Sequence, residues 1–97
     1  MSNRELLNEE EIEDLLTEMS NWQRIDNAIV REKSASNFVS IIGFVNSVAI
    51  LAEQADHHPD MLIYGWNKLR ITLSTHDKGG LTNKDFELAK KIEEIGM

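Results

Sequence analysis

The sequence predicts an α+β domain in which helices cover one face of a four-stranded antiparallel sheet, in the order α-β-β-α-β-β-α. Three observations lead to this fold class. Three segments carry apolar residues at helical spacing, two regions each pair short strand-like segments across a turn, and 97 residues allow one core. We therefore expect residues 1–97 to form a single domain.

The first helix is expected to begin at Asn8, because Asn8 is a suitable N-cap and Glu11 can close a capping box. Its apolar side would comprise Ile12, Leu15, Leu16 and Met19. Residues 22–38 predict a hairpin that turns at Asp26-Asn27, since Asp and Asn tolerate left-handed conformations. The charged residues 31–33 suit an exposed or edge strand.

Residues 37–56 form the strongest predicted helix. Seven residues give a continuous stripe that should face the core: Phe38, Ile41, Ile42, Val45, Val48, Ala49 and Ala52. Four apolar residues lie off that stripe: Val39, Phe44, Ile50 and Leu51. A helix that is apolar on two sides can be buried within its own domain, but in so short a chain the pattern favours contact with a second subunit.

The second hairpin follows Pro59, which should end the helix near Asp56 or His57. We expect strands at residues 61–66 and 69–76, joined at Asn67-Lys68. This register pairs three apolar couples on one face: Trp66 with Leu69, Tyr64 with Ile71, and Leu62 with Leu73. It makes Trp66 a core residue and sets Pro59 opposite His76.

The last helix is expected after a loop at residues 77–80, because Thr82 and Asp85 have capping-box spacing. Its apolar positions would be Phe86, Leu88, Ala89, Ile92 and Ile95.

Composition excludes several classes of function. The chain has no cysteine, which removes disulfides, thiolate nucleophiles and cysteine-ligated metals. A net charge of −7 disfavours direct nucleic-acid binding. No apolar run reaches the roughly 20 residues of a membrane span, and the N-terminus lacks a signal-peptide core, so we expect a cytoplasmic protein that does not enter a membrane.

All three histidines, His57, His58 and His76, fall on either side of the second hairpin. Histidine changes charge near neutral pH, so a cluster of three indicates proton transfer. Glu53 lies one helical turn before His57, and Asp56 precedes it directly, so either carboxylate could orient an imidazole. Alone, each would more often be a solvated helix-end charge. Three histidines could also bind zinc, but adjacent side chains usually point apart, and we expect no metal.

The chemistry-bearing residues resemble the signature of the pterin-4a-carbinolamine dehydratases. The similarity lies in Glu53-x-x-x-His57-His58-Pro59, then Trp66, His76 ten residues later, and finally Asp85. It extends over roughly residues 20–95, including the stretch 71–82 and the first hairpin after Trp22. The two histidine blocks at this separation make the resemblance specific.

The resemblance implies a cofactor-independent hydro-lyase that removes water from 4a-hydroxytetrahydrobiopterin to give quinonoid dihydropterin, in tetrahydrobiopterin recycling. His57, His58 and His76 would be catalytic, with His57 and His76 as acids at the hydroxyl and His58 anchoring the pterin or accepting a proton. The other substrate-site residues would be Glu53, Asp56, Pro59, Trp22, Ser74, Thr75 and Asp85. The resemblance also implies a homodimer or homotetramer.

Two other functions remain open from the sequence. A non-catalytic binding module, acting as a dimerisation or assembly partner of another protein, would not need all three histidines. A metal hydrolase would lose activity with a chelator.

Overall fold

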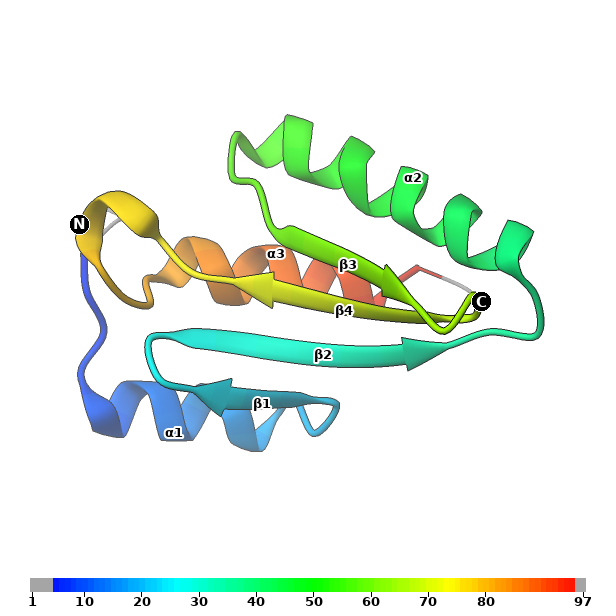
Figure 1. The fold of residues 1–97 in the computed structure, drawn as a ribbon. Helices are drawn as coiled ribbons and strands as arrows, with labels where there is room; N and C mark the ends of the chain where they lie inside the picture. The colour runs from blue at the N-terminus through cyan, green and yellow to red at the C-terminus, as the bar shows by residue number, and fades with distance from the viewer. Residues whose placement is uncertain (1–4, 96–97) are drawn as a thin grey trace.

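The helices and strands follow the predicted order (Figure 1). The computed structural model describes residues 5–95. Its elements in chain order are α1 (Glu9–Thr17), β1 (Trp22–Ile25), β2 (Ala28–Ser34), α2 (Phe38–Ala55), β3 (Asp60–Tyr64), β4 (Lys68–Leu73), the short 3₁₀ helix η1 (His76–Lys78) and α3 (Asn83–Glu93). The strands form one antiparallel sheet in the spatial order β1-β2-β4-β3, which confirms the α+β prediction.

Local capping signals set the helix ends. The Asn8 side chain accepts the N–H of Glu11 at 2.8 Å, and the Glu11 carboxylate accepts the N–H of Asn8 at 2.9 Å. The predicted box of Thr82 and Asp85 is also present at the start of α3. Helix α2 ends at Asp56 in the left-handed conformation (φ 50°), close to the predicted stop before Pro59.

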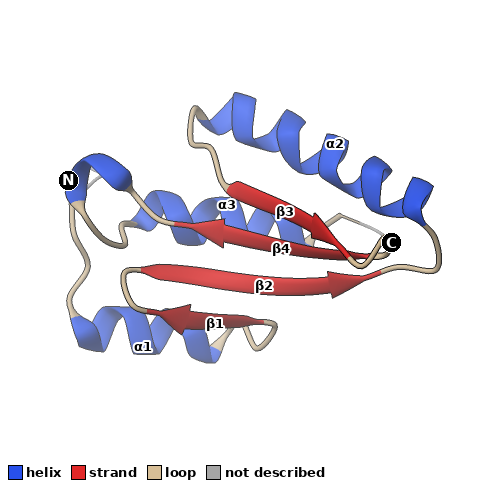
Figure 2. Cartoon of the chain, in the orientation of Figure 1, coloured by secondary structure: helices blue, strands red, loops and turns tan. Residues whose placement is uncertain are grey.

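The core lies between the sheet and the helices. Leu69, Ile71 and Leu73 alternate along β4 and are fully buried, together with apolar residues of all three helices. In Figure 2, α1 and α3 lie behind the sheet, and α2 runs past β3 and packs on α3. On the opposite face Leu62 and Arg70, which are paired in the ladder, are exposed. The helices therefore cover one face, as predicted.

The predicted register of the second hairpin is wrong. Met61, not Tyr64, pairs with Ile71, and the turn occupies residues 65–67 instead of Asn67-Lys68. A shift by an odd number of residues reverses the faces of a strand, so Trp66 leaves the core and is 63% exposed. Continuing the observed register would set Pro59 opposite Leu73 and not opposite His76. Residues 61–64 are all apolar, so alternation could not choose between the two faces.

The inner side of α2 also differs from the predicted stripe. Phe44, expected off the stripe, is buried with Ile41, Val48 and Ala52, and the Lys33 ammonium lies 4.8 Å from its ring centroid. The outer side carries several exposed apolar residues: Phe38, Val39, Ile42, Ala49 and Ile50. Two sides of α2 are thus apolar, as the sequence indicated. Ile41, Val48 and Ala52 of the predicted stripe do face the core, whereas Phe38, Ile42 and Ala49 face outward.

Helix α2 is also long and apolar enough, by length and composition only, to cross a membrane, with a mean hydropathy of 1.6 over its 18 residues. The sequence analysis expected no apolar segment of membrane-spanning length. One such helix is weak evidence for a membrane span; its inner side packs into the core, and 22% of the segment is buried.

Candidate functional site

A fully buried carboxylate, Asp85, joins three segments that are distant in sequence. The Nε2 atom of His57 lies 2.5 Å from Asp85 Oδ1. Asp85 Oδ2 accepts the hydroxyl of Thr75 at 2.8 Å and the backbone N–H of Thr82 at 2.9 Å. Asp85 is 0% exposed and His57 6% exposed, so this network is shielded from water. The end of α2, the end of β4 and the start of α3 therefore meet at one group.

The contact with Asp85 occupies one of the two ring nitrogens of His57. Asp85 Oδ2 accepts two hydrogen bonds, and Oδ1 faces the imidazole, so each oxygen of an ionised carboxylate would have a partner. An ionised Asp85 would favour the tautomer with the proton on Nε2, which leaves Nδ1 as the ring nitrogen without this contact. A carboxylate that orients an imidazole in this way fixes its tautomer and its ring orientation.

The chain reaches this geometry through two turns. At the end of α2, the left-handed Asp56 lets the His57 N–H donate to the carbonyl of Ala52 at 3.1 Å, which turns His57 inward. After β4, the Thr75 N–H donates to the carbonyl of Gly80 at 2.8 Å and closes the loop that carries His76. The two histidine blocks therefore approach each other through Asp85 and not through direct strand pairing.

The other two histidines are exposed beside this buried network. His58 Nε2 lies 2.7 Å from Glu53 Oε1. The sequence suggested that Glu53 could orient His57, but in the structure it orients His58. His76 follows Thr75 directly and begins η1, with its side chain exposed. Ser74 and Pro59 are partly buried, and Asp56 is exposed at the helix end. Within residues 5–95, no group of three His, Cys, Asp or Glu side chains is arranged to hold a metal ion.

Trp22 does not join this cluster. It begins β1, at the opposite edge of the sheet from β3, and is 4% exposed. Its indole N–H donates to Glu93 Oε1 at 2.7 Å, and Arg31 forms an ion pair with the same oxygen at 2.9 Å. The structure thus packs Trp22 beneath α3, away from the three histidines.

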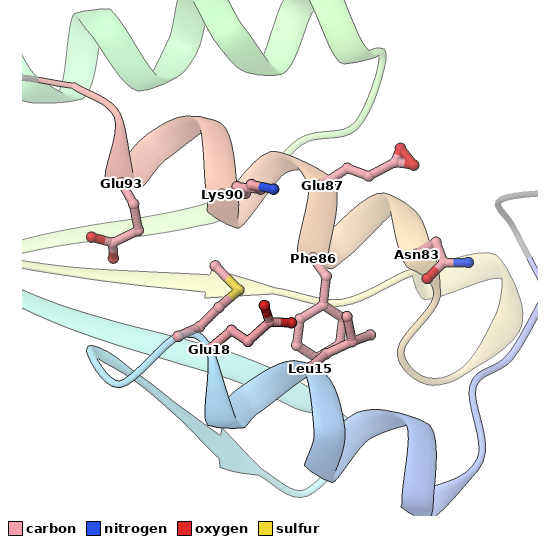
Figure 3. Close-up of a pocket in the computed structure, with 8 residues that line it drawn as sticks. Leu15, Glu18, Asn83, Phe86, Glu87, Lys90 and Glu93 are labelled. Carbon is pink, nitrogen blue, oxygen red and sulfur yellow. The ribbon is translucent and has the colours of Figure 1, made fainter.

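A groove of about 430 Å³ opens between α1 and α3 (Figure 3), and Glu93, the hydrogen-bond partner of Trp22, lines it. It is lined by Leu15, Glu18, Met19, Asn83, Phe86, Glu87, Lys90 and Glu93. None of the histidines lines it, so this recess and the acid–base groups occupy different places.

Sequence reasoning missed one part of the cluster. The capping box predicted that Asp85 binds the N–H of Thr82, but the Thr82 hydroxyl also lies 2.8 Å from the Thr75 hydroxyl. That contact crosses from α3 to the end of β4, and no local sequence signal announces it.

Comparison with known proteins places this geometry in context. The sequence profile of the family described as Pterin 4 alpha carbinolamine dehydratase matches residues 5–95. A Roseiflexus castenholzii protein named "Putative pterin-4-alpha-carbinolamine dehydratase" is 51% identical, over 93% of this chain and 96% of that protein. A Chloroflexus aurantiacus protein of the same name is 49% identical, over 92% of this chain and 95% of its own length.

Two solved structures resemble the fold. The crystal structure of a transcriptional coactivator/pterin dehydratase from Brucella melitensis superimposes with a TM-score of 0.86 at 33% identity, covering 92% of this chain and 96% of that one. A pterin dehydratase-like protein identified as a RuBisCO assembly factor in the alpha-carboxysome gives a TM-score of 0.60 at 18% identity, covering 74% and 82%. The second likeness concerns the fold alone.

Proposed function

We propose a residue-level mechanism from one premise: this chain belongs to the pterin-4a-carbinolamine dehydratase family and is therefore a hydro-lyase. In the proposed reaction it removes water from 4a-hydroxytetrahydrobiopterin and yields quinonoid dihydropterin, which returns the pterin to tetrahydrobiopterin recycling. We further propose that histidines carry out the acid–base steps.

The elimination requires two proton transfers. The bond from C4a to the hydroxyl oxygen breaks, and that oxygen must gain a proton to leave as water. A ring nitrogen loses its proton, and the electron pair of that N–H bond forms the new double bond to C4a. Positioned acids and bases contribute about 10²–10⁴-fold to such a step.

The observation that carries the mechanism is the buried contact between His57 and Asp85. Because Asp85 occupies Nε2–H, His57 exchanges protons with the substrate through Nδ1. The ionised carboxylate compensates the positive charge that the imidazole has when it acts as an acid. Asp85 was expected to line the pterin site, but it is wholly buried, so we assign it a positioning role through His57.

The exposed histidines supply the remaining functions. We assign His76 as the second acid at the hydroxyl, because it lies next to Thr75, which contacts the same carboxylate as His57. His58, oriented by Glu53, anchors the pterin or accepts the proton from the ring nitrogen.

The second candidate is a non-catalytic binding module, and the exposed apolar side of α2 is the observation that favours it. The same surface supports our proposal that the chain forms a homodimer or homotetramer. An inert protein that forms a stable complex with another protein would favour the binding module.

The deciding experiment is the dehydration of synthetic carbinolamine, followed spectroscopically with and without a chelator. His57→Ala and His76→Ala should each lower kcat by about 10²–10⁴-fold. Glu10→Ala, on the exposed side of α1, is the control and should behave as wild type. Full activity in the His57→Ala/His76→Ala double variant would exclude these assignments, and loss of wild-type activity with the chelator would favour a metal hydrolase.

A further inference from the structure

Trp66 lies far from the histidines of its own chain. It sits in the turn at residues 65–67, eight residues after His58, and is 63% exposed. An extended strand rises about 3.3 Å per residue, so roughly 25 Å separate the two positions. Its backbone is also left-handed (φ 57°), which is rare for a bulky residue. Gly65 before it is left-handed too (φ 55°), as a tight hairpin turn requires, so the turn places the indole outside the core, where a second chain can contact it.

The tip of the hairpin is fixed to the start of α2. The Ala35 N–H donates to the carbonyl of Asn67 at 3.0 Å, and the Asn67 side-chain amide donates to the carbonyl of Ala35 at 3.2 Å. Helix α2 begins three residues after Ala35 and spans about 27 Å at 1.5 Å per residue. Figure 1 shows the tip of the β3–β4 hairpin at one end of α2 and the segment after Ala55 at the other.

Between these ends runs an uncharged surface that we call the outer stripe of α2. It consists of Phe38, Val39, Ile42, Gly43, Asn46, Ala49 and Ile50, all exposed. Gly43 is informative, because a Cβ at this position would meet nothing within 4 Å. Glycine weakens a helix interior, and the chain itself makes no use of the space beside Gly43. A second helix approaching closely would use it.

A second copy of this chain fits the outer stripe in the antiparallel direction. Parallel packing would stack the acidic ends, Glu53 and Asp56, on their counterparts, whereas the first turn of α2 holds no acidic residue. Opposite helix dipoles also attract. A twofold axis through Asn46 sets Val39 opposite Glu53 of the partner subunit and Gly43 opposite Ala49 of the partner subunit. The two uncharged surfaces then meet without like charges in contact.

We propose that Trp66 completes the pterin site of the partner subunit, an inference that rests on the proposed function. In antiparallel packing, the start of one α2, next to Trp66, lies beside the end of the other α2. That end carries Glu53 of the partner subunit and leads into His57 of the partner subunit and His58 of the partner subunit. An indole offers a flat apolar face on which a fused heterocycle can stack. Each site therefore contains histidines from one subunit and an aromatic ring from the other.

Complementation between two impaired variants tests this directly. Trp66→Asn removes the ring and keeps a residue that tolerates left-handed backbone, so folding is preserved. We expect it to raise KM at least tenfold for the carbinolamine. Co-expression of differently tagged Trp66→Asn and His57→Ala chains should restore about a quarter of the wild-type sites at low substrate, because half of the random pairs are mixed and each has one intact site.

Each result decides the proposal. Wild-type kinetics for Trp66→Asn, or no recovery in purified mixed oligomers, would overturn it. Gly43→Leu, which fills the space beside the outer stripe, should yield monomers by light scattering with the KM of Trp66→Asn, whereas Gly43→Ala should stay associated. An active Gly43→Leu monomer with wild-type KM would also refute it. A wild-type protein without activity would refute the proposed function instead, and the mass of Gly43→Leu would still decide the pairing.

Discussion

Replacing Asp85 with asparagine isolates the role of the buried carboxylate. The Asp85→Asn amide keeps the shape of the side chain and can still accept the N–H of Thr82 through its oxygen. Its NH₂ group then faces His57 Nε2, which can accept only if the imidazole moves its proton to Nδ1. Nδ1, the nitrogen that exchanges protons with the substrate in the proposed mechanism, would then already hold the proton of the neutral ring. We therefore expect kcat to fall about 10²–10⁴-fold with KM nearly unchanged.

The same substitution should lower stability by an amount that the structure allows us to work out. Asp85 accepts three hydrogen bonds at 2.5, 2.8 and 2.9 Å and is 0% exposed. A hydrogen bond to a charged group contributes about 1.5–3 kcal/mol, and Asp85→Asn weakens at least the one to His57. We therefore expect a loss of about 2–3 kcal/mol, which in a domain of this size lowers Tm by roughly 10–20 °C.

Thermal unfolding and steady-state kinetics on the same preparation check both parts. Glu53→Gln is the matched control for stability, because its hydrogen bond to His58 is exposed, and it should change stability by less than about 0.5 kcal/mol. A wild-type Tm together with a wild-type kcat for Asp85→Asn would refute the argument that this carboxylate holds His57.

Two further predictions concern the framework. The hydroxyl of Tyr64 and the guanidinium of Arg70 hold the pKa of Glu32 below its ordinary value of 4.5, so Glu32 stabilises the fold above that pH and this contribution disappears as the pH falls through the lowered pKa. Urea unfolding of wild type and Glu32→Gln from about pH 2 to 7 should show curves that converge at the acid end, and a constant difference would contradict the assignment. Leu73→Ala, at a fully buried position of β4, should cost about 2–5 kcal/mol in urea unfolding, and a loss below about 1 kcal/mol would mean that this side of the sheet is not the core.

Features set by neighbouring residues could be predicted from the sequence. Both capping boxes and the first hairpin depend on contacts within a few residues, and all three are present as expected. The turn at Asp26-Asn27 supplies the left-handed residue at Asp26, with φ 54°. These elements fixed the order α-β-β-α-β-β-α, and with it the fold class.

Features set by tertiary contacts could not be predicted in the same way. The register of β3 depends on which face of Met61–Tyr64 meets the helices, and the uniform apolar run gives no preference. Phe44 was assigned to the wrong side of α2 because apolar residues occupy more than one side of that helix. The link from Asp85 to His57 joins residues 28 apart, so only the folded chain reveals it.

The Asp85 carboxylate takes part in two separate contacts. Asp85 closes the first turn of α3 through Thr82 and at the same time orients the ring of His57. Fraying of that turn would withdraw the support of the imidazole while the sheet stayed intact. Under the proposed mechanism, a local opening of the chain would then abolish activity at a temperature where most of the fold still persists.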